Sequence, residues 1–505
     1  RGLPVNNLSR YVGLVLVVLV SACATVEPER DRPPEVALSP APLSAWPMLE
    51  ETADGNLFVP MNNGQTALDW RLRALQAATR SIDLQTFIWE SDAAGRALVR
   101  EAVAAADRGV KVRVILDDSF LAHADPVIRA LSEHPMIAYR IYNPLANRAG
   151  GGAMRELENL VEFSRINHRM HNKLLVIDGR VAIVGGRNQA DEYYGYRSGQ
   201  NFRDLEVILQ GPLVTRLSGL FDLYWNDPWT IPIEHLADAS EELPANELAS
   251  WLTAKDSLVN HPQPATPDQW RALFKTGYSG TAKLIVDTPP NESPAVDFPV
   301  QLAQAYIERI DATQSDLFLI SAYFIPTEAL TGAIERATAR GVKVRILTNS
   351  LGSNNHVTAH AAYAEHRPAL LHAGAELYEL RADASARALY VFDEVEESSI
   401  LGLHAKIALF DDCCLMVGSS NLDPRSLRIN TEIGALIDSP DLNAHVRELF
   451  AVDLLPENAW RVKLGETGNV VWVGPEGDLH EAPPASFFMR AESWFFGLLP
   501  IEEQM

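Results

Sequence analysis

The chain carries one polar motif twice, and this duplication limits the folds that are open to it. The first copy runs from His171 to Asn188 and the second from His404 to Asn421. Both fit the pattern H-x-K-x4-D-x6-G-x-x-N, whose five fixed positions would match by chance at roughly one in three million starting points. Two matches therefore indicate a duplicated domain.

The segments that precede the motifs repeat at nearly the same distance. DRGVKVRVILDD at 107–118 matches ARGVKVRILTNS at 339–350, with Gly109 and Gly341 lying 232 residues apart. In each copy a helical pattern ends at this glycine, and a β-branched, apolar run follows it. We expect an α/β fold in which a duplicated domain gives two mixed sheets flanked by helices. A pseudo-twofold axis would relate the copies around one shared active site.

The spacing inside each motif gathers its polar groups. Residues i and i+2 of a strand share a face, so the histidine and the lysine project together. The turn residues that follow predict a β-hairpin. A two-residue loop at 179–180 puts Asn188 opposite His171, and a loop at 178–179 puts it opposite Arg169, on the histidine face in both cases. An imidazole, an ammonium and an amide suit one phosphate, and two copies would supply a nucleophile and a proton donor.

This motif identifies the chain as a member of the phospholipase D superfamily. NHRMHNKLLVIDGRVAIVGGRN and GSSNLDPRSLRINTEIG most resemble the cardiolipin synthase C type of bacterial enzyme. The resemblance implies that His171 attacks phosphorus to form a phosphohistidine, and that His404 is the general acid and then the general base. It implies no metal and no other cofactor. His356 and His360 have helical spacing but no third ligand, so we do not expect a metal site there.

The resemblance also assigns the remaining motif residues. Four side chains would bind the phosphate: Lys173, Asn188, Lys406 and Asn421. Ser419 matches the usual motif serine and would also contact substrate, whereas Gly186 replaces it in the first copy. Asp178 and Asp411 complete the catalytic motif, with a role that is more structural than chemical.

Two carboxylates beyond the motifs are expected to orient the imidazoles. Glu432 stands where family members carry such a carboxylate, and Asp204 is its counterpart in the first copy. A carboxylate of this kind fixes the tautomer of the histidine it contacts. His168 and Arg169, just before the first motif, are either contacts for lipid head groups or ordinary residues at the strand edge.

The amino terminus has the pattern of an exported, lipid-anchored protein. Arg1 and Arg10 flank an opening segment, and the apolar run that follows at 12–20 is too brief to span a bilayer of ~30 Å as a helix. Val-Ser-Ala-Cys then resembles a lipobox, so we expect a signal peptide at 1–22 and a lipid on Cys23. Ala24 after the cysteine favours the outer membrane over the inner one, on the periplasmic side of the bacterial envelope.

Composition shifts predict the remaining boundaries. We expect the lipidated cysteine and a Pro-rich, extended tether at 23–47, a first domain at 48–229, a connecting segment at 230–279 and a second domain at 280–465. A C-terminal extension covers 466–505. Its aromatic stretch either lies in a membrane interface or docks on the protein body. The active site would require no oligomer.

The net charge limits the binding partners that we expect, and the cysteine content bears on disulfide formation. The net charge of −23 argues against binding a long nucleic acid, which needs a basic surface. Adjacent cysteines pair only through a strained ring, so Cys413 and Cys414 are read as unpaired strand residues.

We therefore expect a phosphatidyltransferase that acts on phospholipids. A lipid acceptor would give cardiolipin, and water as acceptor would make the enzyme a phospholipase D. A nuclease of the same superfamily and a non-catalytic lipid-binding lipoprotein are the alternatives.

Overall fold

The computed structural model describes residues 26–49, 55–121, 124–146, 148, 162–236, 243–254, 258–289, 301–397, 399–475, 477–479 and 482–496. The predicted signal peptide and Cys23 lie outside the described residues. Among the described residues, no helix combines the length and the apolar character needed to cross a membrane.

In the part of the first half that the structure describes, eight strands belong to the large sheet. They are β1 (Asn56–Met61), β2 (Ser81–Thr86), β3 (Lys111–Asp117), β4 (Ile137–Tyr142), β5 (Leu174–Ile177), β6 (Val181–Gly185), β8 (Glu206–Gln210) and β9 (Thr230–Pro232). Its longer helices are α2 (Gly64–Ala77), α3 (Ala93–Asp107), α4 (Asp125–Ser132) and α8 (Pro212–Trp225). Shorter helices are η1 (Leu43–Ala45), η2 (Asp118–Phe120), α6 (Phe163–Ile166), α7 (Asp191–Tyr194) and η4 (Ile233–His235). α9 (Ala245–Thr253) and α10 (Pro267–Lys275) occupy the predicted connecting segment.

The second half repeats this arrangement. Its strands are β10 (Tyr278–Val286), β11 (Asp316–Ser321), β12 (Lys343–Asn349), β13 (Glu376–Leu380), β15 (Lys406–Phe410), β16 (Cys414–Gly418), β17 (Ile433–Asp438), β18 (Ala459–Leu464), β19 (Val470–Gly474) and β20 (Gly477–Leu479). Its helices are α11 (Gln301–Ala312), α12 (Glu328–Ala339), α13 (Val357–His372), α14 (Arg387–Tyr390), α15 (Asp393–Glu396), α16 (Pro424–Arg428), α17 (Pro440–Ala451), η5 (Val452–Leu454) and α18 (Phe487–Phe496). As predicted, a glycine with positive φ follows α3 and α12, namely Gly109 (φ 89°) and Gly341 (φ 87°).

The two halves share one large mixed sheet, which corrects the expectation of two separate sheets. Strand pairing runs β9-β4-β3-β2-β5-β6-β8-β1 and continues through β10-β17-β16-β15-β11-β12-β13-β18-β19-β20. The halves join where Asn56–Phe58 of β1 pair antiparallel with 278–280 of β10. This join satisfies backbone groups that two isolated edge strands would leave unpaired. Hydrophobic spacing cannot show that two edges will meet.

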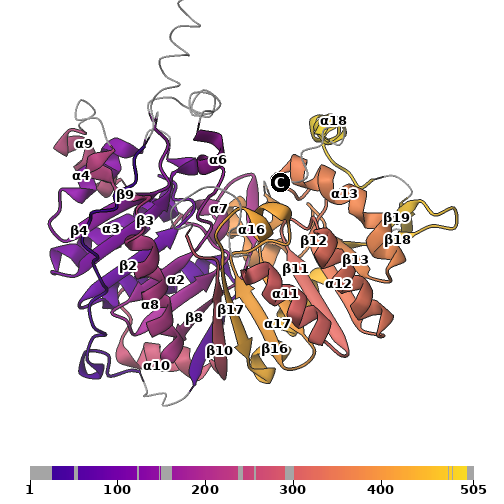
Figure 1. Cartoon of the computed structure of the whole chain (residues 1–505), viewed down its shortest axis with the longest axis horizontal. Helices are drawn as coiled ribbons and strands as arrows, with labels where there is room; N and C mark the ends of the chain where they lie inside the picture. Colours follow the sequence, from indigo (N-terminus) through magenta and orange to yellow (C-terminus); the bar gives the residue numbers. More distant parts are fainter. Residues whose placement is uncertain are drawn as a thin grey trace, which may run out of the picture.

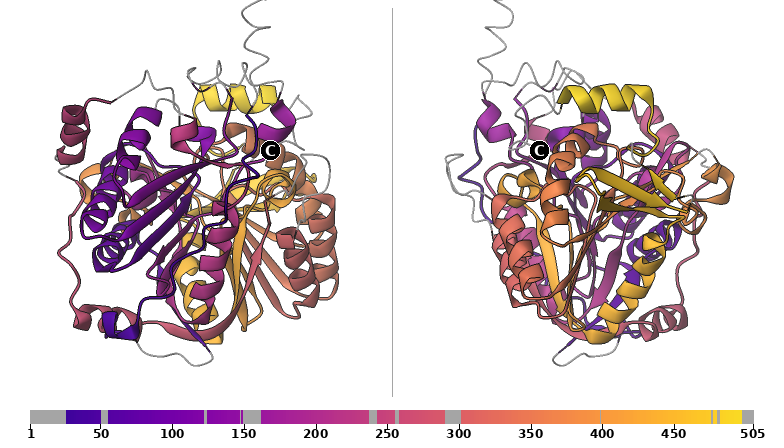
Figure 2. Two further views of the ribbon diagram at one scale, coloured as in Figure 1. Left: turned by 60° about the vertical axis from the view of Figure 1, so that its left-hand side comes forward. Right: turned by 90° about the vertical axis from the view of Figure 1, so that its right-hand side faces the viewer.

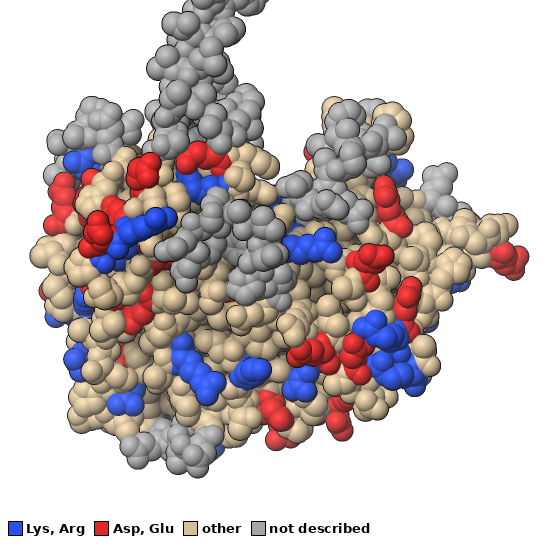
Figure 3. All heavy atoms as spheres, viewed as in Figure 1, with Lys and Arg blue, Asp and Glu red and all other residues tan. Residues whose placement is uncertain are grey.

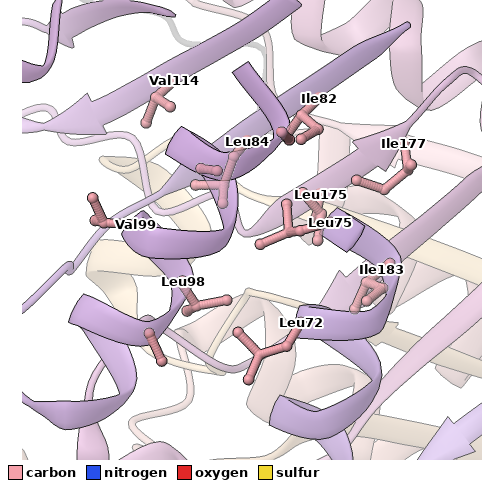
Figure 4. Close-up of a cluster of buried hydrophobic side chains, with 14 of the residues drawn as sticks. Leu72, Leu75, Ile82, Leu84, Leu98, Val99, Val114, Leu175, Ile177 and Ile183 are labelled. Atoms are coloured by element: carbon pink, nitrogen blue, oxygen red, sulfur yellow. The ribbon is translucent and has the colours of Figure 1, made fainter. Parts of the chain in front are cut away.

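Helices cover the sheet (Figures 1 and 2), and among the described residues three hydrophobic clusters hold these layers together. One lies under α2 and α3, where Leu72, Leu75 and Leu98 pack on strand residues such as Leu175 (Figure 4). Another lies under α11, α12 and α13 of the second half. The third contains residues from both halves, including Val207 and Ile437, together with residues of α8 and α17. The halves therefore share a core as well as a sheet.

Both motif hairpins differ from the prediction by one residue in register. Ile177 pairs with Val181 and Phe410 with Cys414, so each turn has three residues instead of two. The turns open with a left-handed aspartate, Asp178 (φ 54°) or Asp411 (φ 47°). Aspartate tolerates this conformation, and the three-residue turn needs it.

The expectation that Cys413 and Cys414 are unpaired strand residues is wrong. The structure joins them in a disulfide, and only Cys414 lies within β16. Cys413 belongs to the turn, which frees its side chain to meet its neighbour.

Residues 26–46 bind the first half and form a strap, whereas the sequence predicted an extended tether. Near its start, the Glu29 amide donates to Pro228 O (2.9 Å), and Arg32 donates to Thr230 O (3.0 Å). Farther on, the Ala41 amide donates to Asp178 O (2.8 Å) and the Trp46 indole to Asp178 Oδ2 (2.9 Å). Prolines disfavour long helices and sheet strands, but they do not prevent an extended segment from binding a surface.

The motif aspartates brace the turns at the end of each hairpin that lies away from the histidine. Asp178 is buried and accepts from the amides of Thr79, Arg80 and Ser81 at 2.8–2.9 Å, as well as from Trp46. Asp411 makes similar contacts to 314–316 but is only half-buried.

We predict that Asp178→Ala lowers the free energy of unfolding by ~2–4 kcal/mol, because it strands several buried donors. The matched Asp411→Ala change should lower the free energy of unfolding by only about 1 kcal/mol, because water can reach the donors at that turn. Chemical denaturation of both variants checks this. Unchanged stability with lost activity in Asp178→Ala would instead indicate a chemical role.

Candidate active site

His171 lies between the two halves, immediately before β5. Its amide donates to Thr431 O (2.9 Å), and the Thr431 amide donates to Arg169 O (2.9 Å), which forms a short parallel bridge between the halves. Its Nδ1 lies 2.9 and 3.0 Å from the two carboxylate oxygens of Glu432. The Phe87 ring packs edge-on at 4.8 Å.

His404 has the equivalent surroundings with the halves exchanged. Its amide donates to Arg203 O (2.8 Å), where β7 (Gln200–Arg203) pairs parallel with β14 (Ile400–Leu403). Its Nδ1 lies 2.7 Å from Asp204 Oδ2. The rings of Tyr193 and Phe202 pack against the imidazole at 4.9 and 5.2 Å.

Each imidazole is thus oriented by a carboxylate from the opposite half. Glu432 of the second half contacts His171, and Asp204 of the first half contacts His404. A carboxylate that accepts from Nδ1–H leaves the Nε2 lone pair available for chemistry. The sequence indicated these two carboxylates but did not indicate that they would cross between halves.

Both motif lysines are buried beside the imidazoles. Lys173 Nζ donates to His171 O (2.6 Å) and Lys406 Nζ to His404 O (2.5 Å). Burial lowers the pKa of Lys406 to about 8, although Asp204 and Glu432 oppose the shift. Each ammonium also acts on the histidine of the other half. Burial lowers the pKa of both imidazoles, and among the further causes Lys406 lowers that of His171 and Lys173 that of His404. The four groups therefore lie in one electrostatic environment.

The two orienting carboxylates differ in charge. Burial favours the neutral form of Asp204, yet the hydrogen bond from His404 and nearby cations hold its pKa at about 2. Burial raises the pKa of Glu432 to about 8, against the influence of Lys173 and Ser419. Asp204 is therefore the stronger stabiliser of an imidazolium.

The motif amides and serine are buried near these groups. Asn188 Oδ1 accepts from the Ile88 amide (3.2 Å). Asn421 Oδ1 has no hydrogen-bond partner within the part of the chain that the structure describes, so it retains capacity for a ligand. Ser419 Oγ donates to Glu432 Oε2 (2.5 Å).

The first copy of the motif has Gly186 where the second has Ser419, because Asp204 lies too close to Gly186 to leave room for a side chain. A Cβ atom at Gly186 would lie 2.4 Å from Asp204 Oδ1. The first half thus combines glycine with aspartate, and the second half combines serine with the longer glutamate. Sequence reasoning noted the missing hydroxyl at Gly186 but not this steric reason.

Several neighbouring side chains support this arrangement, among them His168 and Arg169, which the sequence left as either head-group contacts or ordinary edge residues. Arg187 donates to Asp204 O (2.8 Å) and so supports the backbone of that carboxylate. Asp117 accepts from the Met170 amide (2.9 Å) and lies 3.5 Å from Arg169. His168 Nδ1 lies 2.9 Å from Ile429 O in the other half. Their positions depend on tertiary packing and leave no signal in the motif spacing.

Comparisons with known proteins agree with this arrangement. The family model described as cardiolipin synthase, PLD-like domain, matches residues 72–225 and 306–454. Cardiolipin synthase C of Escherichia coli (strain K12) is 32% identical over 462 residues, which cover 88% of this chain and 95% of that protein. Cardiolipin synthase B of Shigella flexneri is 26% identical over 81% of this chain and 85% of that one. The crystal structure of phosphatidylserine synthase from Haemophilus influenzae Rd KW20 shares the fold, with a TM-score of 0.52, 15% identity, and coverage of 81% and 90%.

The duplicated α/β fold and these matches define a class of phosphodiester-transfer proteins. The chain belongs to the phospholipase D superfamily and is a phospholipase D-type phosphatidyltransferase, a homologue of cardiolipin synthases.

We predict that Gly186→Ala lowers kcat/KM about 10- to 100-fold, because the added methyl group displaces Asp204 from His404. Ser419→Ala should lower kcat/KM less than Gly186→Ala does, because the contact between Glu432 and His171 remains. Gly219→Ala on α8, where a Cβ meets nothing within 4 Å, is the control. Steady-state kinetics with a pH profile decide the matter, and full activity in Gly186→Ala would contradict the steric argument.

A second prediction concerns acid stability. Burial lowers the pKa of His404 from its ordinary value of 6.5 to about 3. Between these pH values the unfolded chain binds a proton that the folded chain does not, so stability falls as pH falls. His404→Asn should reduce this dependence by up to ~1.4 kcal/mol per pH unit.

Urea unfolding between pH 7 and pH 5 measures this difference. Loss of an exposed imidazole in His261→Gln provides the control. Identical slopes for wild type and His404→Asn would mean that His404 binds a proton in the folded protein over this range.

Proposed function

We propose that the protein is a cardiolipin synthase-like enzyme that transfers a phosphatidyl group between alcohols through a phosphohistidine. The observation that carries the proposal is the crossed pair of imidazole–carboxylate contacts, His171 with Glu432 and His404 with Asp204. One phosphorus atom between two oriented imidazoles gives a nucleophile on one side and a proton donor on the other. The pseudo-twofold relation of the halves and their single shared active site are part of this proposal.

In the first half of the reaction, Nε2 of His171 attacks the phosphorus of a phospholipid. The phosphorus–oxygen bond to the leaving alcohol breaks, and His404 gives its Nε2 proton to that oxygen. Lys173 and Lys406, with Asn188 and Asn421, bind the non-bridging oxygens on which charge gathers. The Ser419 hydroxyl adds to this polar environment.

In the second half, the acceptor alcohol attacks the same phosphorus. Its proton passes to Nε2 of His404, and the phosphorus–nitrogen bond breaks to return the electron pair to His171. A glycerol-bearing phospholipid as acceptor gives cardiolipin. No cofactor is needed, because the bond energy is kept in the phosphohistidine.

The carboxylates support this order of roles. His404 is neutral in the protein without substrate, so it must take up a proton when the anionic phosphodiester binds before it acts as an acid, and ionised Asp204 stabilises that imidazolium. His171 must be neutral to attack, and Glu432, whose pKa burial raises to about 8, offers it less negative charge. Asp178 and Asp411 support the turns and take no part in proton transfer.

We also propose that the substrate is a membrane lipid and that the enzyme is held to the envelope by a lipid on Cys23. The lipobox-like sequence supports periplasmic anchoring, with the outer membrane favoured by Ala24. Acidic and basic side chains are interspersed on the face in Figure 3, which suits a lipid better than a long nucleic acid.

Incubation with phosphate-labelled phosphatidylglycerol, phosphatidylethanolamine or single-stranded DNA tests the function. We expect wild type to form a lipid dimer, and His171→Ala to fall to background. His404→Ala should lose about 10²- to 10⁴-fold in rate. After denaturation, acid-labile label should remain on wild type and His404→Ala but be absent from His171→Ala.

The products distinguish the alternatives. Phosphatidic acid would indicate a phospholipase D, and cut DNA a nuclease. No product from any diester would contradict the enzyme reading. Label on His171→Ala with none on His404→Ala would reverse the two roles.

A further inference from the structure

Four exposed aromatic side chains lie on elements that neighbour the candidate active site. Among the side chains that the structure describes, Phe488 is 80% exposed, Trp494 70%, Phe163 49% and Phe120 47%. No other Phe or Trp of this described set is exposed. We call these four residues the aromatic rim.

Phe120 connects the rim to His171 through one other ring. It ends η2, just beyond the carboxyl end of β3, and its ring lies 5.3 Å from that of Phe87. Phe87 in turn lies 4.8 Å from His171. Only the Phe87 side chain therefore links the Phe120 ring to the His171 imidazole.

Phe163 opens α6, which leads directly into the first motif. Asn143 Nδ2 donates to Arg165 O and His168 O, both at 2.8 Å, and so fixes this segment. The Arg165 guanidinium stacks over Trp229 (4.6 Å). Phe163 thus lies on a rigid support beside the His171 side of the site.

α18 brings Phe488 and Trp494 to the His404 side. The helix packs against α13, and a Cβ at Gly352 would lie 2.7 Å from Pro484 O in the segment that leads into α18. His356 immediately precedes α13. Burial lowers the pKa of its imidazole, and the charge of Lys406 lowers it further. The Tyr323 ring contacts both His356 (5.2 Å) and the Lys406 ammonium (6.0 Å).

The two helices of the rim lie on one side of the molecule. Figure 1 places α6 and α18 along its upper edge, and both views of Figure 2 keep α18 (yellow) there. The strap begins on that side as well, because Glu29 binds Pro228 next to Trp229, on which Arg165 of α6 stacks.

The strap sets how far a lipid on Cys23 can lie from this side. Val26 is the first described residue, and three extended residues span at most ~11 Å. From Glu29 to Trp46 the strap is hydrogen-bonded to the body. A lipid attached to Cys23, as proposed above, would therefore limit how freely the enzyme turns.

We propose that the aromatic rim inserts into the surface of a lipid bilayer and that the enzyme works with this side held against the membrane. Phe and Trp side chains at a membrane interface bury their rings among acyl chains and head groups. The site mouth would then open directly on its substrate. The lipid substrate rests on the proposed function, whereas bilayer binding is measured without catalysis.

Binding of the full chain to phosphatidylglycerol–phosphatidylethanolamine vesicles tests the proposal. All proteins carry Cys23→Ser, so that no attached lipid contributes. Phe488→Ser with Trp494→Ser should weaken vesicle binding about tenfold or more. Phe163→Ser, in a different element, should weaken it independently.

Leu223→Ser is the matched control. Leu223 is 41% exposed on α8, and its neighbour Asp222 pairs with Arg113 near the amino end of β3, away from Phe120. Binding of this variant should equal that of its parent.

Lipids with brominated acyl chains quench tryptophan fluorescence on contact, so they report directly whether Trp494 reaches the acyl chains. The fluorescence difference between the parent and Trp494→Phe isolates the Trp494 indole, which should be quenched by brominated vesicles. Transfer by the rim variants should fall on vesicles but be retained in detergent micelles. An inactive parent would contradict the proposed function alone, because vesicle binding and quenching still test the rim.

Two outcomes would overturn the proposal. One is parental vesicle binding by the rim variants with an unquenched Trp494. The other is a parental dimer in sedimentation that the rim variants convert to a monomer without any change in vesicle binding, which would assign the rim to a second copy of the chain.

Discussion

The contact between each imidazole and a carboxylate of the other half is the interaction on which the site depends. His171 and His404 are placed by backbone bonds to Thr431 and Arg203, and the next residue along each partner strand is the carboxylate. One bridge therefore sets both the position and the tautomer of an imidazole. Neither half contains a complete oriented histidine, so the candidate site is assembled only when the shared core and the joined sheet hold the halves together.

Much of this arrangement was predictable from the sequence, because it follows from local patterns. The duplicated motif predicted the fold family and the strand–helix–strand order, and it selected the residues of the candidate site. Gly109 and Gly341 end their helices as expected, because a helix commonly ends in a residue with positive φ and glycine adopts this conformation without strain. The carboxylates Asp204 and Glu432 were identified by resemblance alone.

What the sequence did not predict depends on contacts between distant segments. The continuous sheet arises because β1 and β10 meet, and hydrophobic periodicity carries no information about which edges pair. The one-residue shift of both hairpins follows from left-handed Asp178 and Asp411. The Cys413–Cys414 bond and the binding of residues 26–46 to the body likewise depend on geometry that composition does not encode.

The strap also imposes an order on assembly. Ala41 and Trp46 bind the turn at Asp178, more than 130 residues farther along the chain. The strap precedes β5 and β6 in the chain and is synthesised before them, so its binding site at Asp178 does not exist until these strands have formed. Early in folding it must remain unattached, and closure of the strap then marks completion of the first half.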